Sequence, residues 1–259
     1  MGLNAQTAVP EFQALEVLTA AEMTQVNTGI PVFATTVTRD AAFGGAGEKV
    51  LAEGQFAYIE ASNATQYYDG AAWQSVGVTP GLVPIVPTSV AVTGGGSSAS
   101  ANANGQVTFT SCATLLLNGV FTSTYKNYRI IFEGIGSANA ILNARFATGG
   151  TANTTSNYNF QKLLVNGTAI VAARATGQTS FTITENVNTT YGDIFSCDLS
   201  NPQATQNTSF SSIGMSTAVS SYINQIGGYF ATTTSFDGIQ LIPASGAITG
   251  TISVYGYTI

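Results

Sequence analysis

The chain of 259 residues contains no histidine, only two cysteines and few charges. The absence of histidine removes the usual general base near neutral pH, and with it the Ser-His-Asp and Cys-His nucleophilic sites. Two cysteines without histidine cannot form a Cys/His metal site. We therefore expect no catalytic residues of these classes, no metal and no cofactor.

One enzymatic class needs only carboxylates, because glycosidases work with a pair of them. The part of the chain after residue 87 has five acids: Glu133, Glu185, Asp193, Asp198 and Asp237. Asp193 and Asp198 lie five residues apart in one predicted strand, so they point to opposite faces. No pair converges by this pattern, and we expect that the protein is not an enzyme.

Basic residues are also scarce. Seven Lys and Arg against thirteen Asp and Glu give a net charge of −6. Residues 1–87 hold eight acids and two bases, whereas residues 88–259 hold five of each, which suggests two domains. Neither part offers the basic face that nucleic-acid binding requires.

Targeting features are missing as well. The start of the chain lacks the basic and apolar regions of a signal peptide, and no apolar run reaches membrane-spanning length. We expect assembly in the cytoplasm and no membrane insertion. Cys112 and Cys197 are then predicted to be buried thiols rather than a disulfide.

Hydrophobic residues are plentiful at 44%, although only 8% of residues are charged. The surface must consist of Ser, Thr, Asn, Gln and Gly, which favours strands and turns over exposed helices. We predict a mainly β fold with four parts: an N-terminal arm at 1–17, a small α+β module at 18–76, a Pro/Gly linker at 77–87, and an antiparallel, jelly-roll-like β-sandwich at 88–259.

The first module is predicted to begin with a helix. The arm before it is either a loose terminus or a segment that lies along a neighbouring subunit. Thr19-Ala-Ala-Glu22 forms a capping box, and Leu18 and Met23 are placed as a hydrophobic staple, so a helix should run to about Val26. A second helical turn is expected over 39–43.

Short strands are predicted in the same module at 31–36, 55–60, 66–68 and 73–76. Asp69-Gly70 indicates a tight turn between the last two. The single tryptophan, Trp73, is expected to pack in this small sheet, with stacking on a ligand as the alternative.

Short runs of strand-forming residues, separated by turn residues, fill the rest of the chain. Strands are predicted at 90–92, 107–110, 128–133, 141–147, 160–165, 169–174, 180–184, 193–199, 210–215, 228–232, 238–242 and 251–257. The Gly-rich segment 94–105 reads as a flexible loop or linker. The last two strands, joined by Pro243-Ala-Ser-Gly246, are predicted to form a hairpin.

Four segments resemble tailed-bacteriophage minor tail and fibre proteins. They are Gly-Ile-x-Leu-x-Pro-x-Ser-Gly at 238–246 with Gly-Thr-Ile-x-Val-Tyr-Gly-Tyr at 250–257, the segment 117–132, the segment 193–202, and Tyr-Tyr-Asp-Gly-Ala-Ala-Trp-Gln-Ser-Val at 67–76. The resemblance covers most of 18–76 and 107–259. It implies a virion structural protein, a minor tail or short fibre protein that contributes to host-surface attachment. The alternative is a capsid decoration or head-fibre protein with a purely structural role.

The resemblance, with an unusually uncharged surface, predicts a homotrimer. The N-terminal module, including its helix at Thr19, Glu22 and Met23, would bind other virion proteins. Tyrosine supplies rigid amphipathic surface for a host glycan or protein. Tyr158 and Tyr222, which lie in predicted loops, are the candidate receptor contacts.

Overall fold

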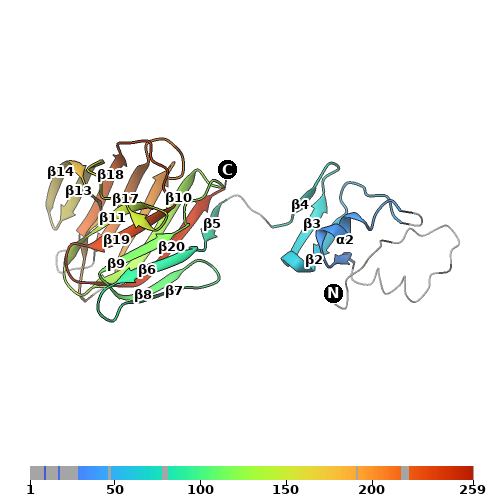
Figure 1. Cartoon of the computed structure of the whole chain (residues 1–259), viewed down its shortest axis with the longest axis horizontal. Coiled ribbons are helices and arrows are strands. Elements are labelled where there is room, and N and C mark those ends of the chain that lie inside the picture. Colours follow the sequence, from blue (N-terminus) through green and yellow to red (C-terminus); the bar gives the residue numbers. More distant parts are fainter. Residues whose placement is uncertain are drawn as a thin grey trace. The chain divides into compact units, whose positions relative to one another are not determined.

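The computed structural model describes residues 9, 17, 29–45, 48–77, 81–190, 192–216 and 222–258. It is mainly β, with 57% of the described residues in strands and 4% in helices, and its sheets are largely antiparallel. The chain divides into two compact units, residues 1–79 and 80–259 (Figure 1). The predicted mainly β class is therefore confirmed.

The first unit contains a four-stranded sheet in the order β1-β2-β3-β4. Its strands are β1 (Val32–Phe33), β2 (Phe56–Ile59), β3 (Ala64–Tyr68) and β4 (Trp73–Ser75), with a 3-10 turn η1 (Glu60–Ser62). β1 runs parallel to β2, and the other pairs are antiparallel. The turn before β4 forms as predicted, because the Asp69 carboxylate accepts hydrogen bonds from the N–H groups of Ala71 and Ala72.

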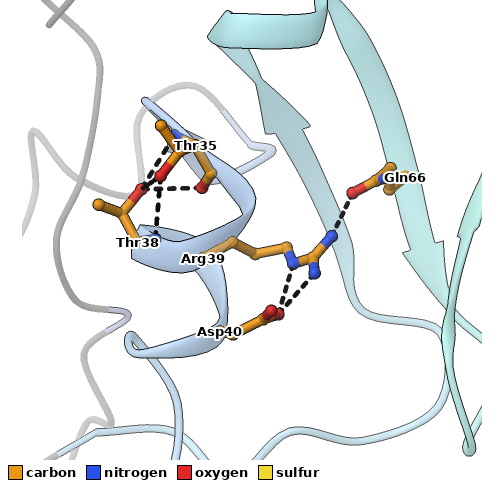
Figure 2. Close-up of polar contacts among 5 residues, drawn as sticks. All are labelled: Thr35, Thr38, Arg39, Asp40 and Gln66. Carbon is orange, nitrogen blue, oxygen red and sulfur yellow. Dashed lines mark hydrogen bonds and ion pairs between the residues drawn. The ribbon is translucent and has the colours of Figure 1, made fainter.

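A short helix, α2 (Thr36–Asp40), lies between β1 and β2 in the chain. Thr35 caps it: its hydroxyl accepts from the Thr38 N–H, and the Thr38 hydroxyl accepts from the Thr35 N–H (Figure 2). The predicted turn at 39–43 thus begins three residues early, since this cap was not recognised in the sequence. The predicted helix with Thr19, Glu22 and Met23 lies outside the described residues.

The core of the first unit is small. Its buried members are Val9, Phe33, Ala42, Ala57 and Ile59, with Phe43 and Trp73 packed against them. Trp73 contacts the rings of Phe43 and Tyr68 at centroid distances of 5.9 and 5.6 Å. These contacts support the predicted core role of Trp73. Val9, which belongs to the predicted N-terminal arm, is buried in the same core.

The second unit holds two sheets. The large sheet runs β14-β13-β18-β17-β16-β10-β20-β8-β7, with β5 also paired to β20. Its strands are β5 (Leu82–Ile85), β7 (Ser98–Ala101), β8 (Val107–Cys112), β10 (Asn127–Gly136), β13 (Tyr158–Asn166), β14 (Ala169–Gln178), β16 (Asp193–Ser200), β17 (Ser209–Ser216), β18 (Tyr222–Phe230) and β20 (Ile248–Tyr257).

The small sheet runs β12-β11-β19-β9-β6, with β15 paired to β11. Its strands are β6 (Ser89–Thr93), β9 (Thr114–Asn118), β11 (Ala140–Thr148), β12 (Thr151–Ala152), β15 (Phe181–Val187) and β19 (Gly238–Pro243). Buried residues of both sheets belong to one hydrophobic cluster, so the sheets pack against each other.

Aromatic rings dominate one part of this shared core. Phe146 from the small sheet lies 5.2 Å from Phe181 and 5.0 Å from Phe236, and Tyr158 lies 4.8 Å from Phe230, both from the large sheet. These five residues, the aromatic cluster, are fully buried. Such rings contribute most of the apolar area in a core of this kind.

Several predicted boundaries were wrong. Residues 82–85 of the predicted linker form β5, which pairs with β20, and Ser98–Ala101 of the predicted loop forms β7. The last two strands are not a hairpin: β19 pairs with β9 and β11, whereas β20 pairs with β10, β8 and β5. The turn after Pro243 carries the chain from one sheet to the other.

The two cysteines are buried and free, as predicted. Burial raises the pKa of the Cys197 thiol and that of Cys112. Both thiols therefore stay protonated at neutral pH, and they behave as small apolar core residues.

Candidate functional site

The face of the large sheet that points away from the small sheet, the outer face, is divided into a polar end and an apolar end. Alternation along β10 buries Tyr128, Ile130 and Phe132 and turns Arg129 and Ile131 outward. Arg129 lies in the polar end, and Ile131 begins the apolar end. The polar end carries the candidate site.

Three side chains form a connected cluster in the polar end. The guanidinium of Arg129 donates from Nε to Asp198 Oδ1 at 2.8 Å and from Nη2 to Asp198 Oδ2 at 2.7 Å. The Tyr257 hydroxyl donates to Asp198 Oδ1 at 2.8 Å, and the Arg129 guanidinium lies 5.8 Å from the centroid of the Tyr257 ring. This bidentate pairing and the ring contact hold the carboxylate in one orientation.

Strand register brings the cluster together from distant parts of the sequence. Arg129 of β10 is paired with Asp198 of β16 on one side and with Tyr255 of β20 on the other. Tyr257 lies two residues further along β20, on the same face as Tyr255. The site therefore depends on the order β16-β10-β20 within the sheet.

Electrostatics keeps the cluster charged. The Arg129 guanidinium lowers the pKa of the Asp198 carboxyl, and the same pairing raises the pKa of Arg129. Burial, and then the hydrogen bond to Asp198, raises the pKa of the Tyr257 hydroxyl. At neutral pH the tyrosine is a neutral donor, and the carboxylate is an acceptor.

An open groove with a volume of about 600 Å³ lies beside this cluster. Its lining includes Asn127, Asp198, Ser200, Ser209, Ser211 and Tyr257. A second hollow of about 240 Å³ is lined by Gln161, Arg174, Gly227 and Tyr229, among others. Ser211 is paired with Gly227, and Ser209 with Tyr229, so the two hollows adjoin on the same face.

Small residues line the groove and the second hollow that adjoins it. A Cβ atom added to Gly227 would meet nothing closer than 3.9 Å, so the space above this glycine is open. Ser209 and Ser211 are exposed and short. Tyr257 and Tyr229 therefore stand on either side of a hollow strip that crosses several strands.

The groove is suited to a ligand rich in hydroxyl groups. A carboxylate has about four acceptor positions, and Asp198 uses only three of them within the cluster. Asn127 accepts a hydrogen bond from the Ser200 hydroxyl through its oxygen, so its amide group can donate to a ligand. Tyrosine rings offer an apolar face on which a sugar ring can stack.

Of the two predicted receptor contacts, Tyr158 does not lie in this groove. Tyr158 is fully buried; its hydroxyl accepts from the Phe146 N–H and donates to the Asn153 carbonyl, both at 3.0 Å. Tyr158 is therefore a core residue, and it cannot contact a receptor. Tyr222 begins β18 instead of lying in a loop.

Sequence reasoning missed Asp198, Arg129 and Tyr257 as site residues. One signal was available: Arg129, Asp198 and Tyr257 are all at outward positions of their strands by alternation. Only the strand order shows that these positions are adjacent.

Asp193 and Asp198 do not form a glycosidase pair, because they lie on opposite faces of β16. Asp193 is buried and accepts a hydrogen bond from the Asn188 side chain at 2.9 Å, whereas Asp198 faces outward, as the spacing predicted. Glu185 is ion-paired with Lys162 at 2.8 Å. Among the described residues no group of His, Cys, Asp and Glu could hold a metal ion.

In the described part of the chain, no helix has the length and apolar character required to span a membrane.

No protein-family model and no curated protein matches the chain. Among solved structures, a protein of unknown function from Shewanella oneidensis MR-1 aligns over 95% of this chain and 97% of its own, with 10% sequence identity and a TM-score of 0.24. So weak a likeness carries no argument about fold or function.

Proposed function

We propose that this chain is a structural protein of a tailed-bacteriophage virion, a minor tail or short fibre protein that contributes to host-surface attachment. A small N-terminal α+β module anchors it to other virion proteins, and a C-terminal jelly-roll-like β-sandwich faces outward. The protein is assembled in the host cytoplasm as a homotrimer. The sequence resemblance supports this proposal, and the outer-face groove is the observation that carries the attachment role.

The proposed receptor group is a host-surface glycan. Saccharides offer hydroxyl groups to carboxylate and amide side chains and an apolar ring face to aromatic residues. The groove supplies Asp198 and Asn127 for the first interaction and Tyr257 for the second. Because Arg129 already neutralises Asp198, a neutral sugar meets no uncompensated charge there.

The test is binding of the full chain to an array of bacterial-surface polysaccharides and oligosaccharides. Gly227→Trp fills the hollow that adjoins the groove, and Tyr257→Ala removes the aromatic wall of the groove; each should weaken binding at least tenfold. Gly95→Trp is the matched control: a Cβ at Gly95 meets nothing within 4 Å, so this site is as open as Gly227, but it lies in the loop between β6 and β7.

Two results would count against the attachment role. The first is wild-type protein that binds no component of the array or of host cells. The second is binding that survives Gly227→Trp and Tyr257→Ala unchanged. Either result would favour the alternative, a capsid decoration or head-fibre protein that needs only an anchoring surface.

A further inference from the structure

The apolar end of the outer face is a continuous surface built by strand register. One row crosses the sheet as Ile194, Met215, Ile223, Val165 and Ile170, each paired with the next. A second row holds Ile131, Ile213 and Leu163, with Ser196 and Gln225 between them. We call the exposed members the outer apolar patch: Ile131, Leu163, Ile170, Ile194, Ile213, Met215 and Ile223.

These side chains are exposed to an unusual degree for large aliphatic residues. Their exposed fractions run from 43% for Ile131 to 72% for Ile170. Burial of a large aliphatic side chain contributes about 2 kcal/mol, at about 25 cal/mol for each Å² of apolar surface removed from water. A fully exposed side chain of this kind therefore presents about 80 Å² of apolar surface. Seven half-exposed side chains then present roughly 300 Å², the size at which a patch is often functional.

The patch ends at an edge of the large sheet, where no further strand pairs among the described residues. β14 is the last strand of the large sheet, and nine of its ten residues are exposed while the tenth is partly buried. Its sequence from Ala169 to Gln178 has one charge, Arg174, and no proline. Edge strands are usually protected from pairing by charges, proline or a covering segment. β14 therefore has the character of a strand that another chain covers.

We propose that the outer apolar patch and β14 form the surface through which copies of this chain pack against one another. A stable interface takes about 800 Å² from each partner, of which about 57% is apolar. The patch supplies roughly two thirds of that apolar share, and the alanines of β14 lie beside it. The available area thus fits a protein partner of standard size.

Charge favours another copy as that partner. The patch itself is uncharged, while Glu133 on β10 and Arg174 on β14 flank its opposite sides and are both exposed. When copies repeat around a symmetry axis, the β10 side of one meets the β14 side of the next. Glu133 of one copy then faces Arg174 of its neighbour, which is a favourable pairing. The number of copies in the assembly is taken from the proposed homotrimer, whereas the association surface itself is inferred independently of it.

The test is the mass of the full chain in solution, measured by light scattering over a range of concentrations. Wild-type protein should have a multiple of the single-chain mass. Ile213→Lys, in the patch, should weaken association more than a hundredfold, because a lysine would be desolvated without a partner. Val86→Lys is the matched control: Val86 is 49% exposed and lies outside the large sheet's strands, so its variant should associate like wild type.

Charge reversal tests the orientation of the contact. Glu133→Arg alone should weaken association, and adding Arg174→Glu should restore it. Both residues are exposed, so neither change should impair folding, which circular dichroism checks.

A wild-type chain that is monomeric at all concentrations would overturn the inference and leave another virion protein as the occupant. So would an Ile213→Lys variant with the wild-type mass. A dimer would support the surface but contradict the homotrimer. Glycan binding is measured in a separate experiment. A monomeric variant that still binds glycan would show that the association surface and the attachment groove act independently.

Discussion

The two units of the chain use aromatic and arginine side chains in different ways. In the first unit the core is thin, and Arg39 covers it: the Arg39 side chain is only 6% exposed, and its guanidinium lies 4.5 Å from the centroid of the Trp73 ring. In the second unit the core between the sheets is filled by phenylalanine and tyrosine, and Arg129 lies outside it with 36% of its side chain exposed.

This difference follows from size. A unit of fewer than about 80 residues buries a smaller fraction of its surface than a larger one, so its apolar core is thin. Arg39 covers Trp73 with its flat guanidinium, while its N–H groups donate to Asp40 and Gln66 (Figure 2). The larger unit has a closed apolar core, so its Arg129 is free to orient a surface carboxylate. A buried arginine is structural here, and an exposed one shapes the candidate site.

The largest effect is expected in the aromatic cluster. Phe146→Ala should lower the free energy of unfolding of the second unit by about 3–5 kcal/mol, because it leaves a cavity among Phe181, Phe236 and their neighbours. The only tryptophan is in the first unit, so its fluorescence follows that unit, whereas far-UV circular dichroism follows mainly the second.

Denaturant unfolding monitored by both signals checks this prediction. The circular dichroism transition should shift and the fluorescence transition should not. Val86→Ala, at an exposed position outside the outer apolar patch, is the control and should change the stability by less than about 0.5 kcal/mol. Equal shifts in both signals after Phe146→Ala would show that the two units unfold together.

Tyr158→Phe should have the next largest effect. It removes a buried hydroxyl that accepts from the Phe146 N–H and donates to the Asn153 carbonyl, so two backbone groups lose a partner. The expected cost is about 1–3 kcal/mol in the free energy of unfolding, measured by circular dichroism. Tyr229→Phe, at a position that is 45% exposed, should be nearly neutral; equal costs at the two positions would refute the argument.

Arg39→Met tests the proposed closure of the small core. It keeps the apolar stem and removes the cation–π contact and the hydrogen bonds to Asp40 and Gln66. We expect a loss of about 1–2 kcal/mol, seen in the fluorescence transition. Lys126→Met, an exposed charge removal in the second unit, should leave that transition in place. An unchanged Arg39→Met transition would mean that the guanidinium does not stabilise the first unit.

The smallest effect on stability is expected from protonation of the Asp198 carboxylate at low pH. Its pKa is lowered below the usual 3.8 by Arg129, so its contribution to stability is complete above the unfolded-state pKa. The contribution is lost as the pH falls through the lower folded-state value. For a partly exposed pair we expect less than about 1 kcal/mol.

Carboxyl NMR titration of wild-type protein should show Asp198 with a midpoint below 3.8, and Arg129→Met should raise that midpoint. Denaturant unfolding at several pH values measures how the free energy of unfolding changes with pH. In Asp198→Asn, the part of the acid-induced loss of stability that this residue causes should be absent. A midpoint that Arg129→Met leaves unchanged would show that the ion pair in the groove does not form in solution.

Local features were predictable from the sequence because they depend on neighbouring residues. The strand predicted at 251–257 lies within β20, and the Asp69-Gly70 turn formed where its side-chain chemistry indicated. Composition was sufficient to predict the mainly β class and the buried, unpaired thiols. Each of these features is set by a repeat of two residues or by a single turn.

Other features depend on which strands become neighbours, and sequence periodicity does not contain that information. Alternation separates two faces of a strand, but it cannot say that Ile194 and Ile213 lie outside while Tyr158 lies in the core. The groove needs Arg129, Asp198 and Tyr257 from three strands far apart in the chain. The amino-acid sequence by itself determined the strands, the turns and the low charge of this protein. Only the tertiary structure decided the candidate site and the exposed patch, because pairing between distant strands is set by the packing of the whole core.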